Sequence, residues 1–288
     1  MYEIQPTKEF LVGIDSDGCA FDTMELKHKE CFIPNTIKYY NLQAISKYAR
    51  EAAEFVNLYS KSRGINRFPA LVESLEWLQK RPEVAARGIT VEIPQALIDW
   101  IEQETKLGNP ALEAKVAESG CPDLKHALDW STTVNDTVAE MVHGVSPFPL
   151  VRESLNKLSE QCDMLVVSAT PNEALKAEWG EHGIDEHITE ICGQESGNKK
   201  ETLSNAVKYG ENKVLMIGDA PGDFKAAVAN DCLFYPINPG AEEASWERFY
   251  NESIDKFLSG EFAGDYQQAL LDEFDSYLPV NPPWPVNG

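Results

Sequence analysis

A short apolar run that breaks at once into acidic residues most constrains the fold of this chain. The segment 10–14, FLVGI, has the composition of a strand buried on both faces, and Asp15-Ser16-Asp17-Gly18 follows it directly. Gly18 can adopt backbone angles closed to other residues, so the chain can leave the strand sharply with both carboxylates facing one crevice. Open α/β sheets bind ligands at such strand ends, but Asp and Gly are also ordinary turn residues. Alone, this stretch supports a ligand site and a simple acidic turn equally.

Length and charge limit the possible partners. The 288 residues can form one large domain or two smaller ones. Forty-seven acidic residues against 25 Lys and Arg give a formal net charge of -22. Such a surface repels nucleic acid and anionic lipid, so we expect neither nucleic acid nor a membrane as a partner. The sequence gives no indication of an oligomeric state.

Targeting signals and cysteine spacing suggest a compartment. The N-terminus, MYEIQPTKEF, lacks a basic lead-in and a long apolar core, and no apolar run approaches the length that crosses a bilayer. The six cysteines include no CxxC and no paired spacing. We therefore expect a soluble, cytoplasmic protein with reduced cysteines and neither disulfides nor a zinc site.

The chain divides into a helical block and an alternating block. Helical periodicity is expected over residues 35–59, 69–78, 94–105, 110–118 and 124–141, several with proline at or near the start. We predict that residues 23–144 form an inserted α-helical domain, and that residues 1–22 and 145–288 form the core with a C-terminal extension. The extension, from residue 239, has aromatic-bearing helical stretches that we expect to pack on the core.

The core alternates strands with helices. Apolar strand candidates lie at residues 10–14, 164–167, 188–192, 214–217 and 232–235, with helical segments between them. This spacing predicts an α/β fold with a doubly wound parallel sheet, covered by helices on both faces.

Three of these strands end in polar residues, namely Asp15 and Asp17, Ser168, and Asp219 and Asp223. The carboxyl ends of parallel strands lie on one edge of the sheet, so these residues can meet in one crevice. Four carboxylates would repel each other and retain protons unless a cation lay among them. A hard divalent ion with oxygen ligands, naturally Mg2+, resolves that repulsion. Zinc is not expected, because no His or Cys is placed to join these acids.

Four segments carry a family resemblance. DSDG, VVSAT, GNKK and GDAPGD, at residues 15–18, 166–170, 197–200 and 218–223, resemble in order the four signature motifs of the haloacid dehalogenase-like (HAD) hydrolase superfamily. Each motif alone is weak, but together they are ordered and each follows a strand. The resemblance covers roughly residues 8–22 and 145–240 and implies a Rossmann-like core.

The resemblance implies roles for the first two motifs. Asp15 would be the nucleophile that forms an aspartyl phosphate, and Asp17 would protonate the leaving group and then take a proton from water. Asp15 and the backbone carbonyl of Asp17 would also bind the metal. Ser168 would hydrogen-bond a phosphoryl oxygen; alternatively it caps the next helix, a role for which Thr170 competes.

The last two motifs would complete the site. Lys199, or less favourably its neighbour Lys200, would hold nucleophile and phosphate together as a cation. Asp219 would bind the metal directly. Asp223 would bind or orient the metal, although it also occupies the expected N-cap of a helix over residues 224–229. Gly218 and Gly222 would let the backbone approach the metal site.

The helical block resembles the cap that closes over the crevice in many of these hydrolases and selects the substrate. Within it, Lys61, Arg63 and Arg67 form a local excess of positive charge that would grip a second anionic group of the substrate. A solvated helix end that favours cations explains them equally well.

Asp17 narrows the reaction class, because dehalogenases and phosphonate-cleaving relatives lack the second Asp. We therefore predict a Mg2+-dependent phosphatase acting on a small phosphorylated metabolite. The alternatives are a phosphoryl-transferring sugar phosphate mutase and a binding or regulatory protein with weak turnover. The substrate cannot be named from the sequence.

Overall fold

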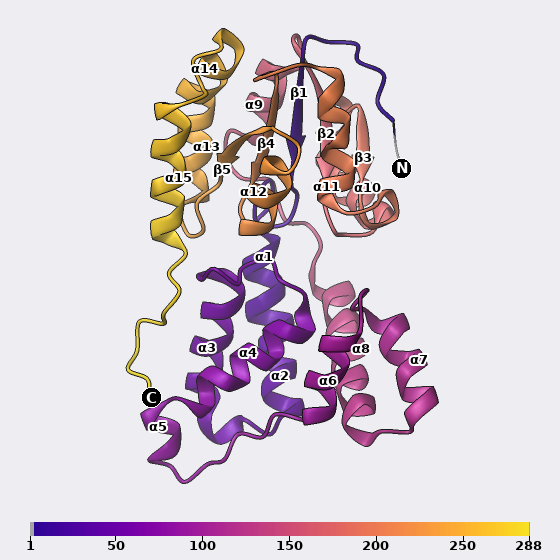
Figure 1. Ribbon diagram of the computed structural model, residues 1–288, viewed down its shortest axis with the longest axis vertical. Coiled ribbons are helices and arrows are strands. Elements are labelled where there is room, and N and C mark those ends of the chain that lie inside the picture. Colours follow the sequence, from indigo (N-terminus) through magenta and orange to yellow (C-terminus); the bar gives the residue numbers. More distant parts are fainter. Residues whose placement is uncertain (1–2, 288) are drawn as a thin grey trace. The chain divides into compact units, whose positions relative to one another are not determined.

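The computed structural model describes residues 3–287, and the chain forms two compact units (Figure 1). Unit 1 comprises Met1–Met24 and Gly144–Leu278, and unit 2 comprises Glu25–His143 and Pro279–Gly288. The chain therefore passes between the units three times. Among the described residues, no helix is both long enough and apolar enough to cross a membrane.

Unit 1 is built on a five-stranded, entirely parallel sheet, which confirms the predicted α/β fold. The strands are β1 (Phe10–Ile14), β2 (Cys162–Val167), β3 (Glu190–Cys192), β4 (Val214–Gly218) and β5 (Leu233–Pro236). Their order is β3-β2-β1-β4-β5. All five predicted strands exist, because buried parallel strands have apolar runs that are easily recognised in a sequence.

Alternate residues of each strand face opposite helical layers. Val12 and Ile217 pack in one apolar cluster with α9 (Val151–Leu158), α10 (Asn172–Glu181), α13 (Glu242–Arg248) and α14 (Ile254–Ser259). Leu11 and Met216 pack in the other with α11 (Lys199–Leu203), α12 (Pro221–Val228) and the end of α15 (Asp265–Tyr277). Both faces of the sheet are thus covered, as a doubly wound fold requires.

The strand order reverses between β1 and β4. The chain builds outward from β1 through β2 to β3 and then returns to place β4 on the other side of β1. The backbone N–H of Asp15 donates to the carbonyl of Ile217 at 3.0 Å, so the two strand ends remain paired where they leave the sheet. In open α/β sheets such a reversal point forms a crevice for ligands.

Unit 2 is helical. Its helices are α1 (Thr23–Leu26, which begins in unit 1), α2 (Ile33–Tyr39), α3 (Ser46–Leu58), α4 (Arg67–Gln79), α5 (Pro82–Ala85), α6 (Gln95–Gln103), α7 (Asn109–Ser119) and α8 (Pro122–Met141). Phe68 anchors the core with its ring centroid 5.0 Å from that of Trp100 and 6.2 Å from that of Trp130. The prediction of one helix over 35–59 is wrong: Asn41 has φ 54°, a left-handed conformation that ends α2.

The C-terminal segment packs differently from its prediction. α15 contacts β5 of unit 1, as expected, but the residues after Leu278 belong to unit 2. The Trp284 ring lies 4.2 Å from the Arg81 guanidinium carbon and 5.5 Å from the Phe55 ring centroid. The Asn287 N–H donates to the Lys80 carbonyl at 2.7 Å. We call residues 279–287 the tail.

Asp163, a buried carboxylate at the start of β2, attaches the N-terminal segment to the sheet. It accepts hydrogen bonds from the Thr7 N–H and hydroxyl, the Lys8 N–H and the Tyr209 hydroxyl, at 2.5–3.0 Å. Burial alone would raise the pKa of Asp163, but these donors outweigh it and lower that pKa below its usual value.

We predict that Asp163→Asn lowers the free energy of unfolding by about 2–3 kcal/mol at neutral pH, because an amide nitrogen would face donors. A lowered folded-state pKa stabilises the fold above the unfolded pKa of about 4, and that stabilisation is lost as pH falls through the folded value. Urea unfolding between pH 3 and 7 should therefore show the difference from wild type shrinking under acid. Asp231→Asn, at an exposed position, is the control; equal losses in both variants would contradict this role.

We also predict that Trp284→Ala destabilises unit 2 by about 1.5–3 kcal/mol, because Arg81 and Phe55 lose an aromatic partner. Hydrogen exchange followed by mass spectrometry should quicken in α3 and α5 and stay unchanged in the strands. Val286→Ala, at a half-exposed tail position, should change little. Unchanged exchange throughout unit 2 would contradict the packing role of the tail.

Candidate active site

Three predicted site carboxylates meet at the reversal point of the sheet. Asp15 follows β1, Asp219 follows β4, and Asp223 lies in the first turn of α12. One oxygen from each lies within 4.8 Å of the others, and the three residues are only 6%, 2% and 1% exposed. The structure thus brings together acids some 200 positions apart in the sequence, as the parallel topology predicted.

The Lys199 ammonium group contacts two of these three acids. Its Nζ lies 2.6 Å from Asp15 Oδ2 and 2.5 Å from Asp223 Oδ1. Burial alone would lower the pKa of Lys199, but the two carboxylates outweigh it and raise that pKa above its usual value. One ammonium beside three carboxylates leaves two negative charges uncompensated among these four groups.

The pKa of Asp15 is shifted first by burial and then by the neighbouring charges. Burial raises it well above its ordinary value, Lys199 opposes the shift, and Asp223 and Asp219 add to it. A further positive charge beside the three acids would favour the ionised form of Asp15. Three hard oxygen donors with two excess negative charges fit a divalent ion such as Mg2+.

Local sequence explains why Lys199, and not Lys200, occupies the site. Asn198 Oδ1 accepts from the Glu201 N–H and Glu201 Oε2 accepts from the Asn198 N–H, both at 2.9 Å, which forms a capping box. The box makes Lys199 the first residue of α11 and directs it to Asp15, whereas Lys200 is exposed. The N-x-x-E spacing is a sequence signal that could have fixed this start.

Asp223 is not an N-cap residue, contrary to one alternative. α12 starts at Pro221, earlier than predicted, and Asp223 Oδ2 accepts from the Ala220 N–H at 3.1 Å. A Cβ on Gly218 would lie 2.5 Å from the Asp223 Cβ, so a glycine is required there. At Gly222 a Cβ would meet nothing within 4 Å, so its role near a metal stays a prediction.

The loop that carries Asp15 is held from behind by residues that the sequence analysis missed. The fully buried Ser16 hydroxyl donates to Glu178 Oε2 at 3.0 Å and accepts from the Trp179 Nε1–H at 2.9 Å. Gly18 has φ 75°, the backbone conformation expected of it. These contacts fix the turn, and the Ser16 N–H donates to Asp15 Oδ1 at 2.8 Å.

The Asp17 carboxylate, the fourth acid of the prediction, is not part of this cluster, and Thr170 links it to Ser168. Asp17 accepts hydrogen bonds from the hydroxyls of Thr23 and Thr170. Ser168 is 5% exposed, and its Oγ accepts from the Thr170 N–H at 3.2 Å. Neither Ser168 nor Thr170 caps α10, because the N-cap position is Pro171 and no side chain caps it.

The three basic residues that the sequence analysis assigned to substrate binding lie in different environments. Lys61 is exposed, whereas Arg63 is 3% exposed and its Nη1 donates to the Leu58 carbonyl at 2.8 Å. Arg67 Nη1 donates to Ser131 Oγ at 3.0 Å and to Asn135 Oδ1 at 2.6 Å. The structure therefore does not gather them into one exposed basic loop, and their contact with substrate stays a prediction.

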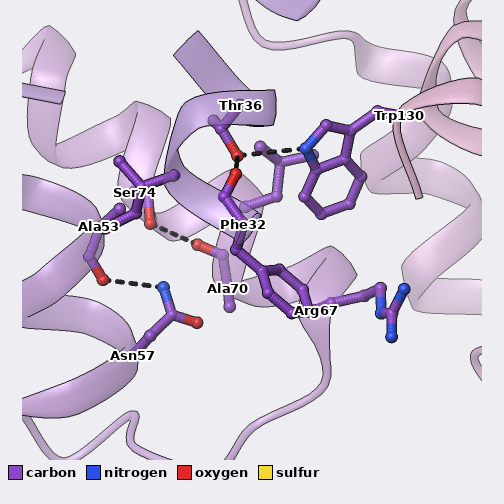
Figure 2. Close-up of a pocket in the computed structure, with 10 residues that line it drawn as sticks. Phe32, Thr36, Ala53, Asn57, Arg67, Ala70, Ser74 and Trp130 are labelled. Atoms are coloured by element: carbon purple, nitrogen blue, oxygen red, sulfur yellow. Dashed lines mark hydrogen bonds between the residues drawn. The ribbon is translucent and has the colours of Figure 1, made fainter. Parts of the chain in front are cut away.

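Figure 2 shows Arg67 beside a cavity within unit 2. The Arg67 guanidinium carbon lies 5.1 Å from the Phe32 ring centroid, and the Trp130 Nε1–H donates to Thr36 Oγ1 at 3.1 Å. Asn57 and Ser74 also line the cavity, but each donates to a carbonyl one helical turn earlier. The cavity of about 20 Å³ holds about one water, so it is no metabolite site in this conformation.

Comparisons with known proteins agree with the motifs. Residues 100–235, slightly under half of the chain, match the family model described as haloacid dehalogenase-like hydrolase. This range includes Ser168, Lys199, Asp219 and Asp223 but not Asp15, which the sheet itself places among them. No protein of curated function matches the chain.

Solved structures that are similar to this chain have low sequence identity. A haloacid dehalogenase-like family hydrolase from Xanthomonas campestris is 11% identical, with a TM-score of 0.46 over 89% of this chain and 95% of that one. A predicted phosphoglycolate phosphatase from Haemophilus somnus is 19% identical, with a TM-score of 0.39 over 80% of this chain and 86% of that one.

We predict that the acid cluster binds one Mg2+ per chain and that Asp219→Asn weakens this binding at least 10-fold, because a charged oxygen ligand is lost. Isothermal titration calorimetry measures the affinity without reference to turnover. Asp231→Asn removes the same charge at an exposed position and should leave the affinity unchanged. Equal affinities for wild type and Asp219→Asn would exclude this cluster as the metal site.

Proposed function

We propose that this haloacid dehalogenase-like hydrolase is a Mg2+-dependent phosphatase of a small phosphorylated metabolite. The observation that carries the proposal is the buried contact of Asp15 with Lys199, beside Asp219 and Asp223. A nucleophile, a fixed cation and a set of metal ligands are the parts that phosphoryl transfer to a carboxylate requires.

Asp15 performs the first step. Ser16 N–H and Lys199 Nζ each hold one of its oxygens, so the carboxylate has a fixed orientation. One Asp15 oxygen forms a bond to phosphorus while the ester bond breaks, and Asp17 gives its proton to the departing alkoxide. Ser168 donates its hydroxyl hydrogen to a phosphoryl oxygen. The products of this step are an alcohol and an aspartyl phosphate on Asp15.

Asp17 also serves the second step. Now ionised, it takes a proton from a water that attacks phosphorus, and the bond from phosphorus to Asp15 breaks. Inorganic phosphate leaves, with Asp15 a carboxylate and Asp17 protonated again. A Mg2+ held by Asp15, Asp219, Asp223 and the Asp17 carbonyl would neutralise the phosphoryl oxygens against the incoming carboxylate.

Substrate selection is assigned to unit 2, which we propose acts as the cap. Its main segment is inserted directly after the loop that carries Asp15 and Asp17. Such insertions can exclude water and contact the non-reacting part of a substrate. Lys61, Arg63 and Arg67 remain candidate contacts to a second anionic group.

We predict that purified protein with Mg2+ releases inorganic phosphate from at least one member of a panel of phosphorylated metabolites, and that EDTA abolishes the release. Asp15→Asn should reduce turnover at least about 10³-fold, because no other carboxylate can accept the phosphoryl group. Its melting temperature should not fall, since the change removes a buried charge. Asp231→Asn is the matched control and should keep wild-type turnover.

The alternatives give different results in this assay. A mutase would pass the phosphoryl group to a second hydroxyl with little inorganic phosphate released. A binding protein would bind Mg2+ at the acid cluster and turn over no member of the panel. Full turnover by Asp15→Asn would overturn the proposed mechanism.

A further inference from the structure

The Asp17 carboxylate is held at both oxygens by hydroxyl groups. Oδ1 accepts from Thr23 Oγ1, and Oδ2 accepts from Thr170 Oγ1 at 2.8 Å. Thr23 lies only six residues further along the chain, but Thr170 comes from the loop after β2. The orientation of Asp17 therefore depends on a residue from a different strand end.

Thr170 also contacts Ser168. Its backbone N–H donates to Ser168 Oγ at 3.2 Å, so this hydroxyl oxygen acts as an acceptor within the loop. The hydroxyl hydrogen of Ser168 then remains to be donated elsewhere. One residue thus orients two groups that the proposed reaction uses, through its side chain for Asp17 and through its backbone for Ser168.

The loop after β3 fixes Thr170 in turn. The Gln194 N–H donates to the Thr170 carbonyl at 3.0 Å. The preceding residue is Gly193, and a Cβ there would lie only 2.3 Å from the same carbonyl oxygen. The Gly193 N–H donates to Asn172 Oδ1 at 2.6 Å, which closes a second link between the two loops. The Thr170 carbonyl can lie this close to residue 193 only because glycine has no side chain.

We propose that Thr170 is a positioning residue, which holds Asp17 in the orientation for proton transfer and Ser168 in the orientation for donating to phosphate. The proposal rests on the function proposed above and adds a residue to it.

The test is whether loss of the hydroxyl impairs proton donation selectively. Thr170→Val keeps the shape of the side chain and removes the donor, while Thr170→Ser keeps the donor. An alkyl phosphate has a leaving group that needs a proton, whereas 4-nitrophenyl phosphate has one that departs without it. We expect Thr170→Val to lower kcat/KM about 10–100-fold for the alkyl ester and less than about 3-fold for the aryl ester.

Two further variants separate positioning from general damage. Thr170→Ser should restore most of the alkyl ester activity, and Thr132→Val, at an exposed position on α8, should match wild type for both esters. Equal losses for both esters in Thr170→Val, or no loss at all, would overturn the proposal.

A crystal structure of Thr170→Val decides the question without any assay. The Asp17 carboxylate should rotate away from its wild-type position, while Asp15 and Lys199 stay in contact. An unmoved Asp17 would contradict the positioning role. If wild type hydrolyses no phosphate ester, the proposed function fails, yet the Asp17 rotation still tests this inference.

Discussion

Three enclosed carboxylates beside a single ammonium group form the constraint on which unit 1 depends. Removing ionised groups from water is costly, and a protein accommodates it only with opposite charge and well-placed donors. The capping box that starts α11 supplies Lys199, and the bare Cα of Gly218 admits Asp223. The Ser16 hydroxyl ties the turn to α10. Each of these local features is ordinary. Together they hold an excess of negative charge that a small cation would relieve.

The topology explains why so much chain can separate residues that touch. In a parallel sheet every crossover returns to the same edge, and the reversal of strand order leaves β1 next to β4 whatever lies between them in sequence. A helical unit can therefore be inserted directly after the Asp15 loop without disturbing the pairing of Asp15 with Ile217. The inserted helical segment and the loop that carries Asp15 are therefore connected at one end of β1.

The sequence predicted features that depend on local patterns better than contacts between residues far apart in the chain. Buried parallel strands have local apolar patterns, and the carboxyl-end rule then placed Asp15, Asp219 and Asp223 together. The left-handed Asn41 was missed because the residue that ends a helix in this conformation is usually glycine and only sometimes asparagine. The link from Thr170 to Asp17 joins residues 153 positions apart. No local pattern marks it, so the sequence offered Thr170 only as a rival helix cap.

Unit 2 is formed by two segments that are separated in the sequence, and the tail is the second of them. Trp284 stacks on Arg81 and contacts Phe55, yet it is encoded after the last helix of the core. A chimera that exchanged only residues 25–143 between relatives would therefore transfer an incomplete domain. Arg81 and Phe55 would be transferred without Trp284, the aromatic residue that packs against them. Because Arg81 and Trp284 are packing partners, a substitution at Arg81 changes which side chains position 284 can accommodate.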